Sequence, residues 1–168
     1  MYKPLLWKIT PLLFLLAVAC SPATPASPTP VSLSTFTDPD AELTTAVRQA
    51  QDTLYIFRRE FFSPKPSYEY MSIKVRFSNT NGIEDIWTYP IDVDGNMYIV
   101  QMVEGVTIEL KTHPDRYVEI PAEDVIDWMI LDNEGTVFGG YTLRLDYERL
   151  SPEEQKAYHE NTGYLRFD

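Results

Sequence analysis

The stretch from Asp124 to Arg144 constrains the fold of this chain more than any other segment. Its apolar run from Trp128 to Leu131 predicts a buried strand, and the residues from Asp132 to Gly135 have the composition of a tight turn. A second strand should follow, and Gly139 and Gly140 then interrupt the pattern, which indicates a bulge or a close approach of two backbones. We expect a final strand after the glycine pair, ending at Arg144. This stretch contains no catalytic motif.

The first 20 residues predict a signal peptide that is separate from the folded domain. Lys3 and Lys8 form a positively charged start, and the apolar run Pro11–Ala19 is shorter than the ~20 residues of a membrane-spanning helix. Cys20 is the only cysteine, and Ala17-Val18-Ala19 before it resembles a bacterial lipoprotein cleavage site. We therefore predict that Cys20 is lipidated and holds the protein on a bilayer, facing the periplasm or the cell exterior. The alternative is an ordinary secretory signal cut at Ala-Val-Ala.

Two further segments complete the predicted domain organisation. Residues 21–37 consist mainly of Ser, Pro, Thr and Ala, which predicts a disordered, semi-rigid stalk, and residues 38–168 should form a single domain. Removal of the leader would change the formal net charge from −11 to −13, because the leader carries two lysines and no acidic residue. Such a charge disfavours nucleic acid as a partner. It fits either a solvated acidic surface or a face that attracts a basic protein.

The hydrophobic pattern of residues 38–168 predicts an α+β domain. Asp38 should cap a helix that ends at Ser63-Pro64. Apolar residues recur along this helix at steps of three and four and form one stripe, which consists of Leu43, Val47, Ala50, Leu54, Phe57 and Phe61. Alternating strands are expected at Met71–Phe77 and Trp87–Val93, and Asp94-Gly95 should form a hairpin turn into Met97–Val103.

The remaining elements are shorter. Strands are expected at Val106–Leu110 and Tyr117–Ile120, and Pro90 implies an edge position or an outward amide in its strand. Ser151-Pro152-Glu153-Glu154 has the pattern of a capping box and begins a helix that should run to about His159, after which Tyr164, Leu165 and Phe167 return to the core. We therefore expect an N-terminal amphipathic helix packed on a coiled antiparallel sheet of five to seven short strands, followed by a short C-terminal helix.

The sequence contains no recognisable metal or cofactor site. His113 and His159 lack metal-ligand spacing, and Asp92–Asn96 has the spacing of a hairpin and not that of a calcium loop. We therefore expect no cofactor and no metal. Glu84 and Asp127 are the best candidates for acid–base chemistry, because each stands near a tryptophan that would desolvate it. Alternatively, Asp127 satisfies backbone amides at a turn.

Arg144 is predicted to pair with a carboxylate if it is partly buried. We expect the partner to be Asp127 or Glu84, and Glu84 has Lys74 as a further possible partner. Five aromatic residues have two possible roles. They line a surface that binds carbohydrate or peptide, or they pack in the core; they are Trp87, Tyr89, Tyr98, Trp128 and Tyr141.

Several short segments resemble a small bacterial family known only as domain of unknown function 2314, the YegJ-like proteins. They are Ile73–Phe77, Glu84–Trp87, Ile126–Met129, Gly139–Arg144 and Leu150–Glu154. The resemblance spans residues 38–168, and Gly-Gly-Tyr-Thr at 139–142 together with Asp127-Trp128 is its most specific part. The chain departs from the family pattern between Gly95 and Arg116. The resemblance implies the fold and implies no activity.

These observations predict a membrane-anchored extracytoplasmic lipoprotein whose domain is a non-catalytic protein-binding module. One alternative is an immunity-type neutraliser of a basic toxin or enzyme, and another is a weak carboxylate-dependent hydrolase of the cell envelope. The candidate structural or binding residues are Trp87, Glu84, Asp127, Trp128, Gly139, Gly140, Tyr141 and Arg144. The sequence does not determine the ligand, the oligomeric state or the choice between inner and outer membrane.

Overall fold

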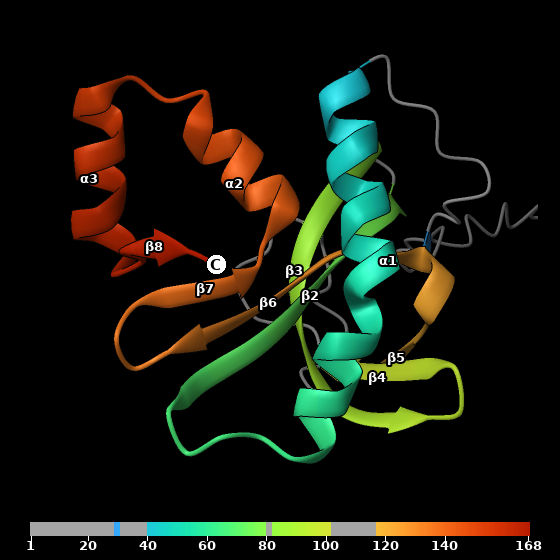
Figure 1. The fold of residues 1–168 in the computed structure, drawn as a ribbon. Helices are drawn as coiled ribbons and strands as arrows, with labels where there is room; N and C mark the ends of the chain where they lie inside the picture. Colours follow the sequence, from blue (N-terminus) through green and yellow to red (C-terminus); the bar gives the residue numbers. More distant parts are fainter. Residues whose placement is uncertain (1–28, 31–39, 80–81, 102–116) are drawn as a thin grey trace, which may run out of the picture.

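The computed structural model describes residues 29–30, 40–79, 82–101 and 117–168. The predicted leader, Cys20, His113 and the predicted strand Val106–Leu110 lie outside the described residues. The architecture is a twisted sheet with the long helix α1 lying across one face, and the smaller helices α2 and α3 beside one end of the sheet (Figure 1). The fold class is therefore α+β, as predicted.

The elements follow one another along the chain as follows: β1 (Thr29–Pro30), α1 (Ala41–Phe62), β2 (Tyr68–Asn79), β3 (Gly82–Asp94), β4 (Met97–Gln101), β5 (Tyr117–Pro121), the 3-10 turn η2 (Ala122–Asp124), β6 (Val125–Asp132), β7 (Thr136–Gly139), α2 (Tyr141–Glu148), α3 (Pro152–Thr162) and β8 (Arg166–Phe167).

The sheet has the strand order β5-β4-β3-β2-β6-β7-β8, and β1 pairs with β2. Every pair is antiparallel except β7 and β8, which are parallel. The strands β2 and β3 have 12 and 13 residues, so the expectation of uniformly short strands is wrong. Their length lets β3 pair with β2 through its first half and with β4 through its second half. Pro90 lies after the last residue that pairs with β2 and next to a register shift opposite β4, which explains how an inner strand accommodates it.

Helix α1 covers the sheet through the predicted apolar stripe. The helix begins at Ala41, and its N-cap is Asp40 and not Asp38, because the Asp40 carboxylate accepts from the amides of Glu42 and Leu43. Phe57 is fully buried, and its ring contacts those of Tyr98 and Trp128 at 6.1 and 6.0 Å between centroids. The main core therefore lies between α1 and one face of the sheet.

The C-terminal part departs from the prediction in two places. Residues Tyr141–Glu148 form the helix α2 and not a strand, because Gly140 adopts a left-handed conformation (φ 63°) that ends the extended backbone. Leu165 is 59% exposed, whereas Tyr164 and Phe167 pack against the small core cluster beside β6 and β7. The predicted capping box of Ser151 and Glu154 is present at the start of α3, which extends to Thr162.

Candidate functional site

Asp127 is a fully buried carboxylate that caps the start of helix α2 from a neighbouring strand. One oxygen accepts hydrogen bonds from the amides of Trp128 (2.8 Å) and Tyr141 (3.1 Å). The other accepts from the amide and the hydroxyl of Thr142, at 2.8 and 2.7 Å. Since Gly140, the N-cap residue, has no side chain, Asp127 satisfies amides of the first turn that would otherwise have no partner.

Trp128 and Gly139 connect this cap to the rest of the core. The indole N–H of Trp128 donates to the carbonyl oxygen of Ala50 and to the hydroxyl of Thr53 on α1, both at 3.1 Å. A Cβ atom on Gly139 would lie 2.5 Å from the carbonyl oxygen of Trp128 and 2.7 Å from its ring. The predicted close backbone approach at the glycine pair is therefore confirmed, and Asp127-Trp128 with residues 139–142 forms one clamp that joins α1, β6 and α2.

Lys74 brings a positive charge next to the buried cap. Its ammonium donates to the Thr142 hydroxyl at 3.1 Å and lies 5.6 Å from the centroid of the Trp87 ring. Burial raises the pKa of the Asp127 carboxyl, and its hydrogen bonds to Thr142, Trp128 and Tyr141 oppose that shift. Lys74, Thr142 and Asp127 thus form a continuous polar chain from the half-buried surface to the interior.

Arg144 does not pair with either predicted carboxylate. It lies on α2, and its Nη2 donates to the carbonyl oxygen of Asp168 at 2.9 Å, while its guanidinium lies 5.7 Å from the centroid of the Phe167 ring. Asp127 is bonded to other donors. The predicted pairing is therefore wrong. The chain turns into a helix after Gly140, and this turn directs Arg144 toward the C-terminus.

Glu84 and Asp127 lie on opposite faces of the sheet. Glu84 is opposite Phe77 in the pairing of β3 with β2, whereas Asp127 is opposite Lys74 in the pairing of β6 with β2. Because side chains alternate along a strand, Phe77 and Lys74 point to different faces. Two carboxylates in this arrangement cannot act as acid and base on the same bond, so the geometry gives no support to the hydrolase alternative.

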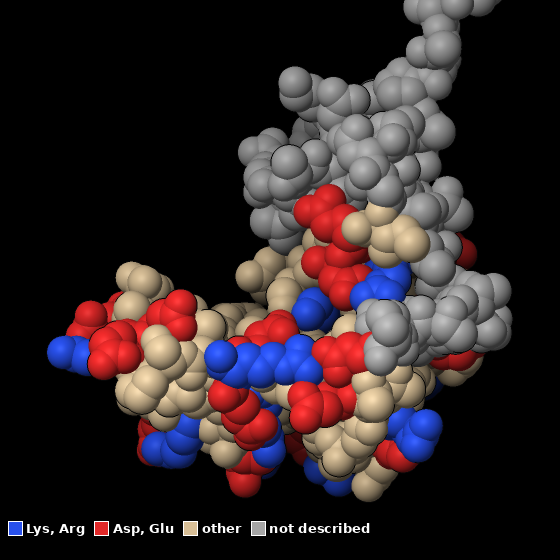
Figure 2. All heavy atoms as spheres, turned by 90° about the horizontal axis from the view of Figure 1, so that it is seen from above, with Lys and Arg blue, Asp and Glu red and all other residues tan. Residues whose placement is uncertain are grey.

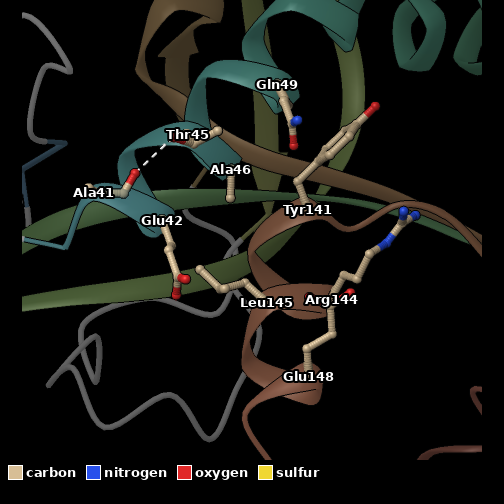
Figure 3. A pocket seen from close by; sticks show the side chains of 9 residues that line it. All are labelled: Ala41, Glu42, Thr45, Ala46, Gln49, Tyr141, Arg144, Leu145 and Glu148. Carbon is tan, nitrogen blue, oxygen red and sulfur yellow. Dashed lines mark hydrogen bonds between the residues drawn. The ribbon is translucent and has the colours of Figure 1, made fainter.

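A groove of about 590 Å³ lies between α1 and α2. In Figure 3, Gln49 of α1 and Tyr141 of α2 extend toward each other at one end of the groove, and Glu42 lies beside Leu145 at the other. Arg144 turns away from α1 in the same view, in agreement with its bond to Asp168. The carboxylate of Glu42 is already bound to Arg149 at 2.7 Å. The groove therefore presents mixed polarity without a group of convergent free charges among its described residues.

Figure 2 views the molecule from the end at which α1 begins. Basic side chains lie between acidic ones on this face. Among the ion pairs of the described residues, Arg149 bonds to both Asp40 and Glu42 at 2.7 Å. Acidic and basic side chains are interspersed on the described part of this face (Figure 2).

A different surface exposes apolar side chains. Tyr89 and Tyr117 both pair with Gln101, from opposite sides of β4, so the two tyrosines point to the same face of the sheet. They are 44% and 57% exposed, and the neighbouring Ile91 is 48% exposed. We call Tyr89, Ile91 and Tyr117 the β3–β5 surface. The opposite face of the same strands is core, where Tyr98, Val100 and Ile120 are buried.

The structure separates the predicted site residues into three groups. Asp127, Trp128, Gly139, Gly140 and Tyr141 come together in the clamp, Trp87 joins them through Lys74, and Glu84 and Arg144 do not. Of the five aromatic residues offered as a surface, Tyr98 and Trp128 are buried and Tyr89 is exposed.

Two contributions are not predictable from the sequence. Thr142 belongs to the Gly-Gly-Tyr-Thr segment that carries the family resemblance, but its bond to Asp127 has no local signal because the two residues are 15 positions apart. Tyr117 was assigned only to a strand, since alternation alone does not tell which face is covered.

The described residues also bear on metal sites and membrane helices. None of them form a group of three or more His, Cys, Asp or Glu side chains that could hold a metal ion. His159, near the end of α3, bonds to the Tyr147 hydroxyl at 2.8 Å and to the carbonyl oxygen of Tyr164, so both ring nitrogens have partners. Within the same described ranges, no helix is long and apolar enough to cross a membrane.

Comparison with known proteins gives one match. The model of a family described as an uncharacterized protein conserved in bacteria (DUF2314) matches residues 40–166. No curated protein and no solved structure matched the chain. The matched range contains every described helix from α1 to α3, and with them the whole clamp.

Proposed function

The chain belongs to the DUF2314 family of uncharacterized bacterial proteins, and we propose that it is a lipid-anchored protein of the cell envelope whose domain binds another protein without catalysing a reaction. The observation that carries this proposal is the β3–β5 surface. It exposes two tyrosines and an isoleucine on one face of the sheet, whereas the polar groups of the clamp already bond to one another. Tyrosine is enriched at protein interfaces because its ring buries a large area at a small cost in side-chain entropy.

The anchoring part of the proposal is supported by the leader. Ala17-Val18-Ala19-Cys20 ends an apolar segment with a positively charged start. We expect the mature protein to begin at a lipidated Cys20 and to fractionate with membranes, and a Cys20→Ser variant to lose the lipid. Mass spectrometry of the purified N-terminus measures both. An unmodified leader on wild-type protein in the cytosol would contradict the proposed anchor.

Photo-crosslinking in cells tests the binding surface. A photoreactive amino acid would replace Tyr117 or, as a control on a separate surface, the exposed Tyr55 on α1. We expect one defined protein to be crosslinked from position 117 and not from position 55. The crosslink should be lost when Tyr89→Ser is added and retained when Phe62→Ser, at a more exposed position on α1, is added instead. No crosslink at position 117, or the same products at both positions, would overturn the proposal.

A second candidate function, neutralisation of a basic toxin or enzyme, is favoured by the charge of the same region. The described residues of β3, β4, β5 and η2 contain seven carboxylates and no lysine or arginine; the carboxylates belong to Glu84, Asp85, Asp92, Asp94, Glu119, Glu123 and Asp124. Such a field speeds association with a basic partner and is screened by salt. We expect the association rate with the crosslinked partner to fall steeply as salt is added. A rate independent of salt would remove this candidate.

A further inference from the structure

The strand β5 is the edge strand at one end of the described sheet, and it carries Tyr117 of the β3–β5 surface. It pairs with β4 along all five of its residues, from Tyr117 to Pro121, without a register shift. No described residue pairs with its other side. The backbone groups on that side therefore have no partner strand within the described part of the chain.

The two ends of the sheet differ in how well they are protected. The strand β8, at the opposite end, has only two residues, and its Arg166 forms an ion pair with Glu134 at 2.9 Å. Short strands, bulges and lysines are the usual means by which proteins prevent pairing at an edge. The strand β5 has no bulge and no lysine, and Glu119 is its only charged residue. Only Pro121, which lacks an amide proton, limits pairing at its far end.

The charges around β5 indicate which side chains an added strand would carry. Glu119 on β5, Asp92 and Asp94 on β3 and Glu123 on η2 are exposed, and no basic residue occurs in these described elements. The ring of Tyr117, exposed at the start of β5, can pack against an ammonium or guanidinium group. Arg58 of α1 lines a pocket with Glu123, but the carboxylates of Glu119, Asp92 and Asp94 form no ion pair with a described residue. These three carboxylates favour a partner segment that contains lysine or arginine.

We infer that the outer edge of β5, which has no partner strand among the described residues, binds an extended, basic segment of a partner protein as an additional strand of the sheet. Main-chain hydrogen bonds to β5 provide the affinity, and the carboxylates beside it select basic side chains at alternate positions. This inference rests on the proposed function, since it names how the protein partner docks next to the β3–β5 surface.

Amide hydrogen exchange of the full-length protein in detergent tests the inference. The probe is a short peptide of alternating lysine and valine, and a peptide of alternating glutamate and valine is its counterpart. We expect the basic peptide to slow exchange in β5 by about tenfold or more and the acidic peptide to leave it unchanged. Binding without protection of β5 amides would show adsorption to an acidic surface only, and would overturn the inference.

Matched charge reversals locate the contact. Glu119→Lys places a lysine on the edge, and Glu69→Lys makes the same change at an exposed glutamate on β2, three strands away. We expect Glu119→Lys to weaken binding of the basic peptide by about fivefold or more and Glu69→Lys to have a much smaller effect. Equal weakening by both variants contradicts the inference. If the cellular crosslink at position 117 is found but the β5 amides gain no protection, the proposed binding surface is retained and the added strand is rejected. If neither the crosslink nor the protection is found, the proposed function is rejected as well.

Discussion

Asp127 accepts hydrogen bonds from both the amide and the hydroxyl of Thr142, at 2.8 and 2.7 Å, from a strand that lies 15 residues earlier in the chain. This contact joins two separate segments of the chain, Asp127-Trp128 and residues 139–142. Their proximity has a structural explanation, because a helix whose N-cap residue is a glycine needs a side-chain cap from another part of the chain. The clamp therefore accounts for these residues without assigning them a reaction.

Replacement of Asp127 by asparagine should destabilise the domain. The variant side chain keeps its shape, but its NH2 group would face the Thr142 amide and hydroxyl, which are donors. We expect the free energy of unfolding to fall by about 1–3 kcal/mol, measured by urea denaturation. Asp146→Asn, an exposed position on the same helix, is the control and should change it by less than about 0.5 kcal/mol. Equal stability of the two variants would contradict the capping role.

Gly139→Ala should cost more stability than Gly163→Ala. Both glycines have φ of 73°, so the strain of a left-handed residue is common to the two variants. Only at Gly139 would the new Cβ meet the backbone and ring of Trp128, whereas nothing lies within 4 Å at Gly163. We expect an additional loss of about 1–3 kcal/mol at Gly139. Thermal unfolding of the two variants in parallel measures it, and identical losses would show that the close approach has no energetic consequence.

The contact between Asp40 and Arg149 should make stability depend on pH. The hydrogen bond from Arg149 lowers the pKa of the Asp40 carboxyl below its ordinary value of 3.8. The stabilisation is therefore present above the unfolded pKa and is lost as pH falls through the lowered pKa of the folded state. We expect Arg149→Met to reduce the melting temperature at neutral pH and to have a vanishing effect in strong acid. Arg48→Met, at an exposed position on α1, should show no such trend; a pH-independent effect of Arg149→Met would refute the prediction.

Trp128→Phe tests the link between the clamp and α1. Phenylalanine retains most of the buried ring and loses the N–H that bonds to Ala50 and Thr53. We expect a loss of about 1–3 kcal/mol in the free energy of unfolding, from the missing hydrogen bonds and the smaller ring. Trp87→Phe, at a partly exposed position, should cost less. Guanidinium denaturation measures the free energy of unfolding of both variants. A larger loss for Trp87→Phe than for Trp128→Phe would contradict the role of Trp128 in joining the clamp to α1.

Local chemistry made several elements of this fold predictable. The apolar stripe that ends in Phe57 and Phe61 indicated a helix packed on a sheet, and the hairpin at Asp94-Gly95 and the capping box at Ser151 lie where their residues predicted them. Each of these signals acts over a few neighbouring residues. The start of α1 was misplaced by two residues because Asp38 and Asp40 are both good caps, and only the observed bonds distinguish them.

The sequence by itself determined the fold class, the family and the acidic balance of the domain. The tertiary structure alone decided that Tyr141–Glu148 is a helix, that Glu84 and Asp127 lie on opposite faces and that Tyr89 and Tyr117 are exposed. The physical reason is the same in each case. Periodicity shows which side chains share a face, but the partner that caps a helix or covers a face comes from a distant part of the chain.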